Sequence, residues 1–232
     1  LGVIGAIAVR RGAPWIDGRS SGTIEPVADG SFAVVTAARR YDDLRPSLAG
    51  RHQWDNARLV IVALETLAPA LPRPVTPEAV ARGLSQTRWP GRLQWIEGRP
   101  RVLLDGAHNP AGIAALVGHL AERPIRPRPV LLFGTTREKD LDLVLAPLLP
   151  YVDGLVAGRA GIDRAMDPAI IVEWARARAP WVVAETDPGT ALARARLQAG
   201  EDGAVLVTGS LYLVGDVLTA LDATGAPGPV AM

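Results

Sequence analysis

The stretch Val102-Leu103-Leu104-Asp105-Gly106-Ala107-His108-Asn109-Pro110 decides the fold of this chain. Three apolar residues typical of a buried strand lead into a bend that contains a glycine, and a proline suited to the first turn of a helix follows. The stretch therefore predicts a strand that ends at Leu104 and a helix that begins near Pro110. In open α/β sheets ligands bind at such strand ends, because loop side chains and helix N-terminal N–H groups gather there.

The composition is that of an ordinary globular protein. The chain has 232 residues, 48% of them hydrophobic and 21% charged, with a formal net charge of +1. This balance indicates one large or two modest domains and suggests neither nucleic acid nor a membrane surface as a partner. Zero cysteines exclude disulfides and thiolate metal sites, and no run approaches the roughly 20 apolar residues of a membrane span. We expect a soluble, cytoplasmic protein.

Short apolar runs alternate with helical patterns in the second part of the chain. The expected strands are Val102–Leu104, Val130–Phe133, Gly154–Ala157, Trp181–Ala184 and Ala204–Val207, and the expected helices are Ala111–Glu122, Leu141–Leu149, Ala169–Arg178, Thr190–Ala199 and Leu211–Leu221. Such an alternation predicts an α/β fold with a mainly parallel sheet and helices on both faces.

Residues 1 to about 85 differ from this pattern. Ser31–Thr36 predicts a strand, Arg39–Gly50 a loop, and Asn56–Leu67 a helix. A second helix is expected to begin after the capping residue Thr76 and to run to about Leu84. We place a boundary near residues 86–89, which gives domains 1–87 and 88–232. The tail, residues 223–232, is rich in glycine and proline and is expected to be frayed.

The bend after Leu104 has two interpretations. In the simpler one, Asp105 caps the helix, Gly106 makes the turn and Pro110 occupies the first helical turn. That interpretation leaves His108 unexplained, although a histidine offers both a donor and an acceptor near neutral pH. Its position at a strand end favours a His108 that faces a ligand.

Three further segments carry candidate chemistry. In residues 50–56, Asp55 or Asn56 either caps the following helix or belongs to a site, and both interpretations remain open. Arg92, in Trp89-Pro90-Gly91-Arg92, is either an exposed arginine in a rigid turn or a guanidinium held for a phosphate or carboxylate. Ser210 either caps the last helix or, if it faces the crevice, helps its N–H groups to bind a carboxylate.

The loop Gly134–Asp140 reaches the same expected edge with two threonines and a cluster of charges. We interpret Arg137 and Glu138 as solvated residues of this loop. Lys139 is the sole lysine of the chain, so these residues contain no phosphate-cradling loop that ends in Gly-Lys-Ser or Gly-Lys-Thr. No Gly-x-Gly-x-x-Gly follows an expected strand either, which argues against a dinucleotide oxidoreductase.

Five ordered matches make the chain resemble the folylpolyglutamate synthase and dihydrofolate synthase family, within the Mur-type ATP-dependent amide ligases. They are Leu48–Ala57, Trp89–Gln94, Leu103–Pro110, Lys139-Asp140 and Gly209–Gly215. The bend reads Asp-Gly-Ala-His-Asn-Pro, as in the folate ligases, and His52 is followed by glutamine, again as in those enzymes. The resemblance covers roughly residues 44–221.

The resemblance implies an enzyme that joins L-glutamate to a folate or dihydropteroate carboxylate through an acyl phosphate made from ATP. By position, Asn56, Arg92 and Asp105 resemble the family's ATP contacts, the last at the domain interface, while His108 and Ser210 resemble residues that hold glutamate. Asp105 and His108 would orient the attacking amine or a nucleotide hydroxyl, and we take them as the catalytic pair. The cofactors implied are ATP and Mg²⁺, the partners are small molecules, and the family favours a monomer.

The chain also departs from the family pattern. The family's phosphate loop and magnesium ligands precede anything present here, so we assign no metal ligand to this chain and expect the ligands in a missing N-terminal part. Where the family has Glu-Lys-Ala-Gly, with a carbamylated lysine near magnesium, this chain has Arg10-Arg11-Gly12-Ala13. Arginine does not take that modification, so either the alignment slips or the group is lost.

We therefore expect residues 1–87 to be the remnant of a central P-loop-type ATPase domain without its phosphate loop, and residues 88–232 to be the glutamate-binding domain. The chain would be an incomplete copy that is inactive by itself. The alternatives are a catalytically inactive ligand-binding or interaction module derived from the family, and another Mur-type amino-acid ligase.

Overall fold

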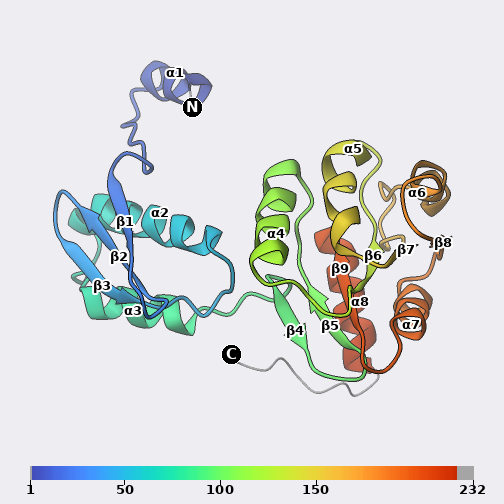
Figure 1. Cartoon of the computed structure of the whole chain (residues 1–232). Helices are drawn as coiled ribbons and strands as arrows, with labels where there is room; N and C mark the ends of the chain where they lie inside the picture. The colour runs from blue at the N-terminus through green and yellow to red at the C-terminus, as the bar shows by residue number, and fades with distance from the viewer. Residues whose placement is uncertain (1, 224–232) are drawn as a thin grey trace. The chain divides into compact units, whose positions relative to one another are not determined.

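The computed structural model describes residues 2–223 and divides into two compact units, Leu1–Arg88 and Trp89–Met232 (Figure 1). They are called unit 1 and unit 2 below. The expectation of a frayed tail falls on residues beyond Ala223, outside the described part. Within residues 2–223, no helix combines the length and apolar character needed to cross a membrane.

Unit 2 is built on a six-stranded sheet. Its strands are β4 (Gln94–Ile96), β5 (Arg101–Leu104), β6 (Val130–Phe133), β7 (Gly154–Ala157), β8 (Val182–Ala184) and β9 (Ala204–Thr208), in the order β4-β5-β9-β6-β7-β8. All neighbours pair in parallel except β4, which pairs antiparallel with β5. The predicted α/β fold with a mainly parallel sheet is therefore confirmed, and β4 is an addition that the sequence pattern did not reveal.

Helices cover the sheet of unit 2. They are α4 (Pro110–Glu122), α5 (Leu141–Val144), the 3₁₀ helix η2 (Ala146–Tyr151), α6 (Pro168–Ala175), α7 (Pro188–Ala199) and α8 (Leu211–Ala223). α7 and α8 pack together, and their apolar side chains share one core with alternate strand residues such as Val102, Val130 and Val205. The intervening residues Leu103, Leu131 and Leu206 are buried too, so both faces of the central strands are covered.

One expected helix is broken in two. Residues 141–149 were expected to form a single helix, but α5 ends at Val144 and a 3₁₀ helix follows. Pro147 has no N–H to continue the α-helical hydrogen bonds and its ring crowds the preceding turn, which explains the break.

Unit 1 contains a three-stranded antiparallel sheet, in the order β1 (Gly22–Pro26), β2 (Phe32–Thr36) and β3 (Arg40–Leu44). It is accompanied by α1 (Gly2–Arg10), α2 (His52–Leu67), the short 3₁₀ helix η1 (Ala68–Ala70) and α3 (Pro77–Gln86). The strand expected at Ser31–Thr36 and the cap at Thr76 are confirmed, since the Thr76 side chain accepts from the Ala79 N–H. The loop expected at Arg39–Gly50 is wrong in part, because it contains β3.

α2 begins four residues earlier than expected, at His52. Its N-cap is Arg51, which makes no side-chain capping bond, so neither Asp55 nor Asn56 caps the helix. The physical reason is packing: Trp54 stacks on Phe32 with ring centroids 4.7 Å apart, and Gln53 is buried. Residues 53–54, which look like part of a polar loop in the sequence, thus pack against the core of unit 1.

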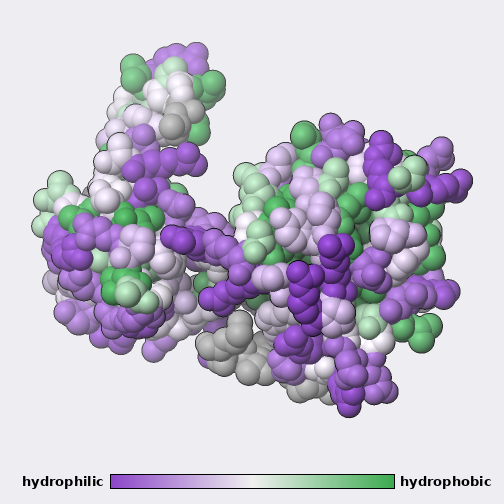
Figure 2. All heavy atoms as spheres, viewed as in Figure 1, coloured by the Kyte–Doolittle hydropathy of each residue, from purple (hydrophilic) through white to green (hydrophobic). Residues whose placement is uncertain are grey.

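α1 buries none of its described residues. Val3, Ile4, Ile7 and Val9 are all exposed, and Figure 2 shows apolar side chains on the surface of this helix. The core of unit 1 lies elsewhere, around Phe32, Tyr41 and Ile61.

Candidate functional site

The loops that follow β5, β9 and β6 meet at one edge of the sheet in unit 2. These three strands are neighbours, and parallel strands bring their carboxyl ends to the same edge. The Gly209 N–H donates to the Ala107 carbonyl at 2.9 Å, and the Thr208 hydroxyl donates to the same carbonyl at 3.2 Å. The bend after β5 and the turn after β9 are therefore bonded to each other.

Asp105 is buried and organises the bend. Its Oδ2 accepts the Leu93 N–H at 3.0 Å, and its Oδ1 accepts the Ala107 N–H at 2.9 Å. The Gly106 N–H also donates to the Gly91 carbonyl, at 2.7 Å. Asp105 thus fixes the turn that carries Arg92 against the bend. Asp105 was also considered as the helix cap, and that interpretation is wrong.

The cap of α4 is Asn109. Its side-chain oxygen accepts the Gly112 N–H at 2.9 Å, and Pro110 takes the first helical turn as expected. Asp105 lies too far ahead of the first helical turn, and the extended backbone of Asn109 provides the capping geometry. The carboxylate of Asp105 is thereby available to hold two separate loops together.

The turn Trp89–Leu93 is held in an unusual backbone conformation. Gly91 has φ +70° and Leu93 has φ +45°, a region that residues with a side chain rarely adopt. The bond from Leu93 to Asp105 stabilises it. Arg92 lies between these two residues and is half-buried, and within the described part of the chain its guanidinium has no hydrogen-bond or ion-pair partner.

His108 is partly buried, and its Nδ1 lies 2.8 Å from the Gly106 carbonyl oxygen. A carbonyl oxygen only accepts, so Nδ1 must carry the proton in this bond. In the neutral ring Nε2 is then an acceptor, and in the protonated ring it is a second donor. The bend therefore fixes the orientation of the imidazole and leaves Nε2 for another group.

Ser210 is buried immediately before α8. Its Oγ accepts the Tyr212 N–H at 3.2 Å, which is a capping bond, and its carbonyl accepts the Val214 N–H at 3.1 Å. The capping interpretation is therefore correct. It does not exclude a ligand, because a hydroxyl that accepts one hydrogen bond still has its own proton to donate.

The loop after β6 exposes Arg137 and Glu138 to solvent and is also held by hydrogen bonds. The Arg137 side chain donates to the Asp163 carbonyl, and the Arg137 N–H donates to the Arg164 carbonyl at 3.0 Å. The Thr136 hydroxyl donates to Glu138 at 2.7 Å and holds the pKa of that carboxyl below its ordinary value, with Lys139 and Arg164 acting in the same direction. Arg137 and Glu138 are both exposed, as expected for a solvated loop, and the Arg137 side chain is also held by a backbone carbonyl.

Arg164, which the sequence did not single out, pairs with Tyr212 in the first turn of α8. The Arg164 Nη2 donates to the Tyr212 hydroxyl at 3.0 Å, and its Cζ lies 5.3 Å from the centre of the Tyr212 ring. Arg164 belongs to an irregular loop 48 residues earlier in the chain, so no periodicity or spacing could have revealed the pair.

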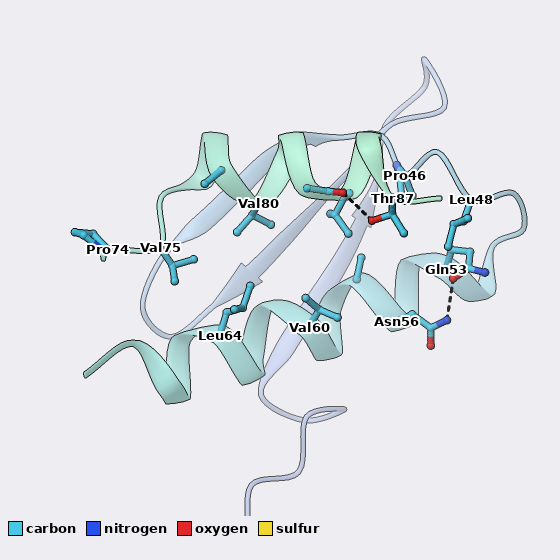
Figure 3. A pocket seen from close by; sticks show the side chains of 14 residues that line it. Pro46, Leu48, Gln53, Asn56, Val60, Leu64, Pro74, Val75, Val80 and Thr87 are labelled. Atoms are coloured by element: carbon cyan, nitrogen blue, oxygen red, sulfur yellow. Dashed lines mark hydrogen bonds between the residues drawn. The ribbon is translucent and has the colours of Figure 1, made fainter. Parts of the chain in front are cut away.

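In unit 1, Asn56 is exposed on α2, and its Nδ2 donates to the Gln53 side-chain oxygen at 2.9 Å. Both amides lie at one end of a cavity of about 490 Å³ between α2 and α3 (Figure 3). The rest of the lining is mainly apolar and includes Val60, Leu64 and Val80. His52 contacts the Gln53 amide at 3.0 Å. The structure therefore brings Asp105, His108, Arg92 and Ser210 together in unit 2 and places Asn56 in unit 1.

Residues 2–223 were expected to contain no metal ligand. No group of three or more histidine, aspartate or glutamate side chains in that range could hold a metal ion.

Residues 91–211 match the family described as "Mur ligase, glutamate ligase domain". Over 187 residues the chain is 29% identical to the dihydrofolate synthase/folylpolyglutamate synthase of Bacillus subtilis. The matched region covers 80% of this chain and 43% of that protein. The chain thus spans less than half the length of this curated relative.

Two solved structures are similar over nearly the whole chain. E. coli FolC in complex with DHPP and ADP has a TM-score of 0.81 at 24% identity, over 97% of this chain and 51% of that one. Mycobacterium tuberculosis folylpolyglutamate synthase complexed with ADP has a TM-score of 0.79 at 26% identity, over 99% and 53%. The family match covers more than half of the residues and contains the whole bend and its neighbouring loops. The chain belongs to the Mur ligase family, as a member with its glutamate ligase domain, and resembles the folylpolyglutamate and dihydrofolate synthases within it.

Proposed function

We propose that this chain is the C-terminal part of an ATP-dependent ligase that joins L-glutamate to the carboxylate of a folate or a dihydropteroate. The folate carboxylate attacks the terminal phosphorus of ATP and releases ADP, and the resulting acyl phosphate reacts with the amine of glutamate. The amine loses a proton, an amide bond forms and inorganic phosphate leaves. In this proposal unit 2 binds glutamate, and unit 1 is the end of the ATPase domain.

The observation that carries the proposal is the bond between the loops after β5 and β9. It brings the His108 loop and the Ser210 cap together at one sheet edge, through the Gly209 N–H and the Ala107 carbonyl. The loops lie at the neighbouring strands where ligands bind in open α/β sheets. The family and the named relatives make glutamate the ligand to test first.

His108 and Ser210 have complementary roles. A glutamate amine is protonated in water and must lose a proton before it attacks, and Nε2 of a neutral His108 is an acceptor held in place by the Nδ1 bond. The Ser210 hydroxyl and the N-terminal N–H groups of α8 suit a carboxylate, because the helix end carries partial positive charge. Together they would orient the amine and one acid group of glutamate.

Arg92 and Asn56 are proposed to contact ATP. A guanidinium without a protein partner can stabilise charge that develops on the transferring phosphoryl group. Asp105 positions Arg92 through the Leu93 N–H, and its carboxylate is proposed to contact a nucleotide hydroxyl. ADP in the solved relatives supports ATP as the nucleotide.

We expect a monomer that acts in the cytoplasm, and magnesium ligands supplied by a preceding ATPase half. The alternative, a catalytically inactive ligand-binding module, keeps the same loops but has no turnover in any context. Another Mur-type amino-acid ligase would keep the chemistry and change the acceptor.

The decisive experiment follows ADP formation. The 232-residue chain alone is expected to show no glutamate-dependent ATP hydrolysis, whereas the same chain joined to a family ATPase half is expected to form ADP only when glutamate and a folate or dihydropteroate are both present. Turnover by the chain alone would contradict the division of labour. Absence of turnover in the joined protein, with both units folded, would favour the inactive module.

A further inference from the structure

We propose that Arg164 is a specificity-determining residue that pairs with one carboxylate of the bound amino acid. This inference rests on the proposed function, since it names a further residue of the same glutamate-binding edge.

The first turn of α8 lies between two loops. On one side Leu211 packs on the bend, so closely that a side chain at Gly106 would overlap it. On the other side Tyr212 receives the hydrogen bond of Arg164 at 3.0 Å. The loop that carries Arg164 follows β7 and is bonded to α8 a second time, because the Gly161 N–H donates to Asp216 at 2.8 Å. The N-terminus of α8 is therefore flanked by the bend that carries His108 and by Arg164.

Arg164 is held while its charge is not neutralised by an ion pair. Its carbonyl accepts the Arg137 N–H, and its side chain is fixed by the Tyr212 hydroxyl and ring. No salt bridge to Arg164 occurs in the described residues. A guanidinium presents five N–H donors, so the bond to Tyr212 leaves donors for a carboxylate.

The charges around Arg164 are mixed. Glu138 and Asp163 are the nearby acids and Arg137 and Lys139 the nearby cations, while Asp216 is engaged by the Gly161 N–H. Glu138 is already held by the Thr136 hydroxyl. The loop after β6 also contains Thr135, whose carbonyl accepts the Met166 N–H at 2.8 Å and so joins it to the loop that carries Arg164. The Thr135 hydroxyl is buried and has no hydrogen-bond partner among the described residues. Such an unsatisfied polar atom is uncommon in a finished protein interior and fits a site that a polar ligand completes.

Arg164 and Ser210 differ in how well they distinguish a carboxylate from an amide. A hydroxyl and backbone N–H groups bind a carboxylate or an amide oxygen, whereas a guanidinium favours the charged group strongly. Arg164 would therefore decide between an amino acid with two carboxylates and its amide, with Tyr212 as the residue that positions it.

The test is the binding of L-glutamate, L-glutamine and L-isoglutamine to the 232-residue chain, measured by calorimetry. Arg164→Gln is expected to weaken glutamate binding about tenfold or more, the effect of one charge-assisted contact. It should also abolish the preference for glutamate over one of the two amides. Arg164→Lys is expected to restore part of the affinity, and Tyr212→Phe to weaken binding less than Arg164→Gln.

Arg178→Gln is the matched control. Arg178 also lies over an aromatic ring, with its Cζ 4.5 Å from the centre of Trp174, but it follows α6, near the start of β8 and away from the carboxyl edge. The substitution Arg178→Gln removes the same charge as Arg164→Gln, and it should leave the affinities for glutamate, glutamine and isoglutamine unchanged. Equal glutamate binding by wild type and a folded Arg164→Gln, with both amide preferences intact, would overturn this inference alone. Wild-type protein that binds no glutamate would overturn the proposed function together with it.

Discussion

The two units place their candidate residues in different ways. In unit 2, Asp105, His108 and Ser210 are each held by a hydrogen bond with a backbone group: Asp105 and Ser210 accept from an N–H, and His108 donates to a carbonyl. In unit 1, Asn56 lies exposed on a helix beside a largely apolar cavity, and its side chain donates to another amide, that of Gln53. Backbone groups thus fix the polar side chains at the edge of unit 2, whereas in unit 1 the amide of Asn56 is held only by a neighbouring side chain, that of Gln53.

The largest expected effect is on turnover, in the chain joined to an ATPase half. Arg92→Ala should reduce the rate about a hundredfold or more, because it removes a positive charge at the transferring phosphoryl group. Asn56→Ala should raise the KM for ATP only several-fold, as expected for a neutral hydrogen bond. Steady-state kinetics measure both. Arg99→Ala, in the hairpin between β4 and β5, is the control; equal effects of Arg92→Ala and Asn56→Ala would break the contrast between the units.

The next effect is on the stability of the edge in unit 2. Gly209 has φ +97°, and a Cβ there would lie 2.5 Å from the Phe133 ring and 2.6 Å from the Gly134 carbonyl oxygen. Gly209→Ala should therefore lower the free energy of unfolding by about 3 kcal/mol, from backbone strain and overlap together. Urea unfolding measures it. Gly215→Ala, in α8 with nothing within 4 Å, should instead stabilise the protein by about 0.5–1 kcal/mol; similar values for both would show that the edge is not tightly fixed.

A smaller loss is expected at Asp105. Asp105→Asn leaves one of the two bonded N–H groups facing an amide NH₂ and should cost about 1–3 kcal/mol. Hydrogen exchange at the Leu93 amide should become faster. Asp140→Asn is the control, since Asp140 is a helix N-cap where asparagine serves as well. An unchanged Leu93 amide would mean that Asp105 does not hold the Arg92 turn.

The smallest effect is a pH dependence in unit 1. Hydrogen bonds from the Ser31 hydroxyl and N–H, together with Arg45, lower the pKa of Asp29 from 3.8 to about 2. Because the folded pKa is depressed, the stabilisation is present above about pH 4 and is lost as the pH falls towards 2. Asp29→Asn should therefore reduce the acid sensitivity of unit 1 over this range. NMR-monitored melting of each unit checks it, and the signals of unit 2 should not respond.

The sequence predicted the regular parts of unit 2 well. Val130–Phe133 and Gly154–Ala157 are continuous apolar runs because these strands are buried on both faces, so composition alone marked them. The strand β3 was missed because only Tyr41 and Leu44 of its five residues are buried. The start of α2 was missed because stacking of Trp54 on Phe32, not a capping signal, stabilises it.

The candidate site, too, could be predicted from the sequence only in part. The motif positions of Asp105, His108 and Ser210 could be predicted, because a strand followed by a helix brings a loop to a known edge. The division of labour between Asp105 and Asn109 could not, because both residues are common caps and only the position of Leu93 shows which one is engaged elsewhere. Their roles towards ATP and glutamate stay predictions.

By itself the sequence determined the alternation of β5 to β9 with helices along unit 2, the presence of a polar bend after β5 and its likeness to the folate ligases. These depend on local patterns of apolar and turn-forming residues. Only the tertiary structure shows three hydrogen bonds: from the Gly209 N–H to the Ala107 carbonyl, from the Leu93 N–H to Asp105, and from Arg164 to the Tyr212 hydroxyl. Such contacts join residues that are distant in the chain, and their geometry exists only once the sheet has brought the strand ends together.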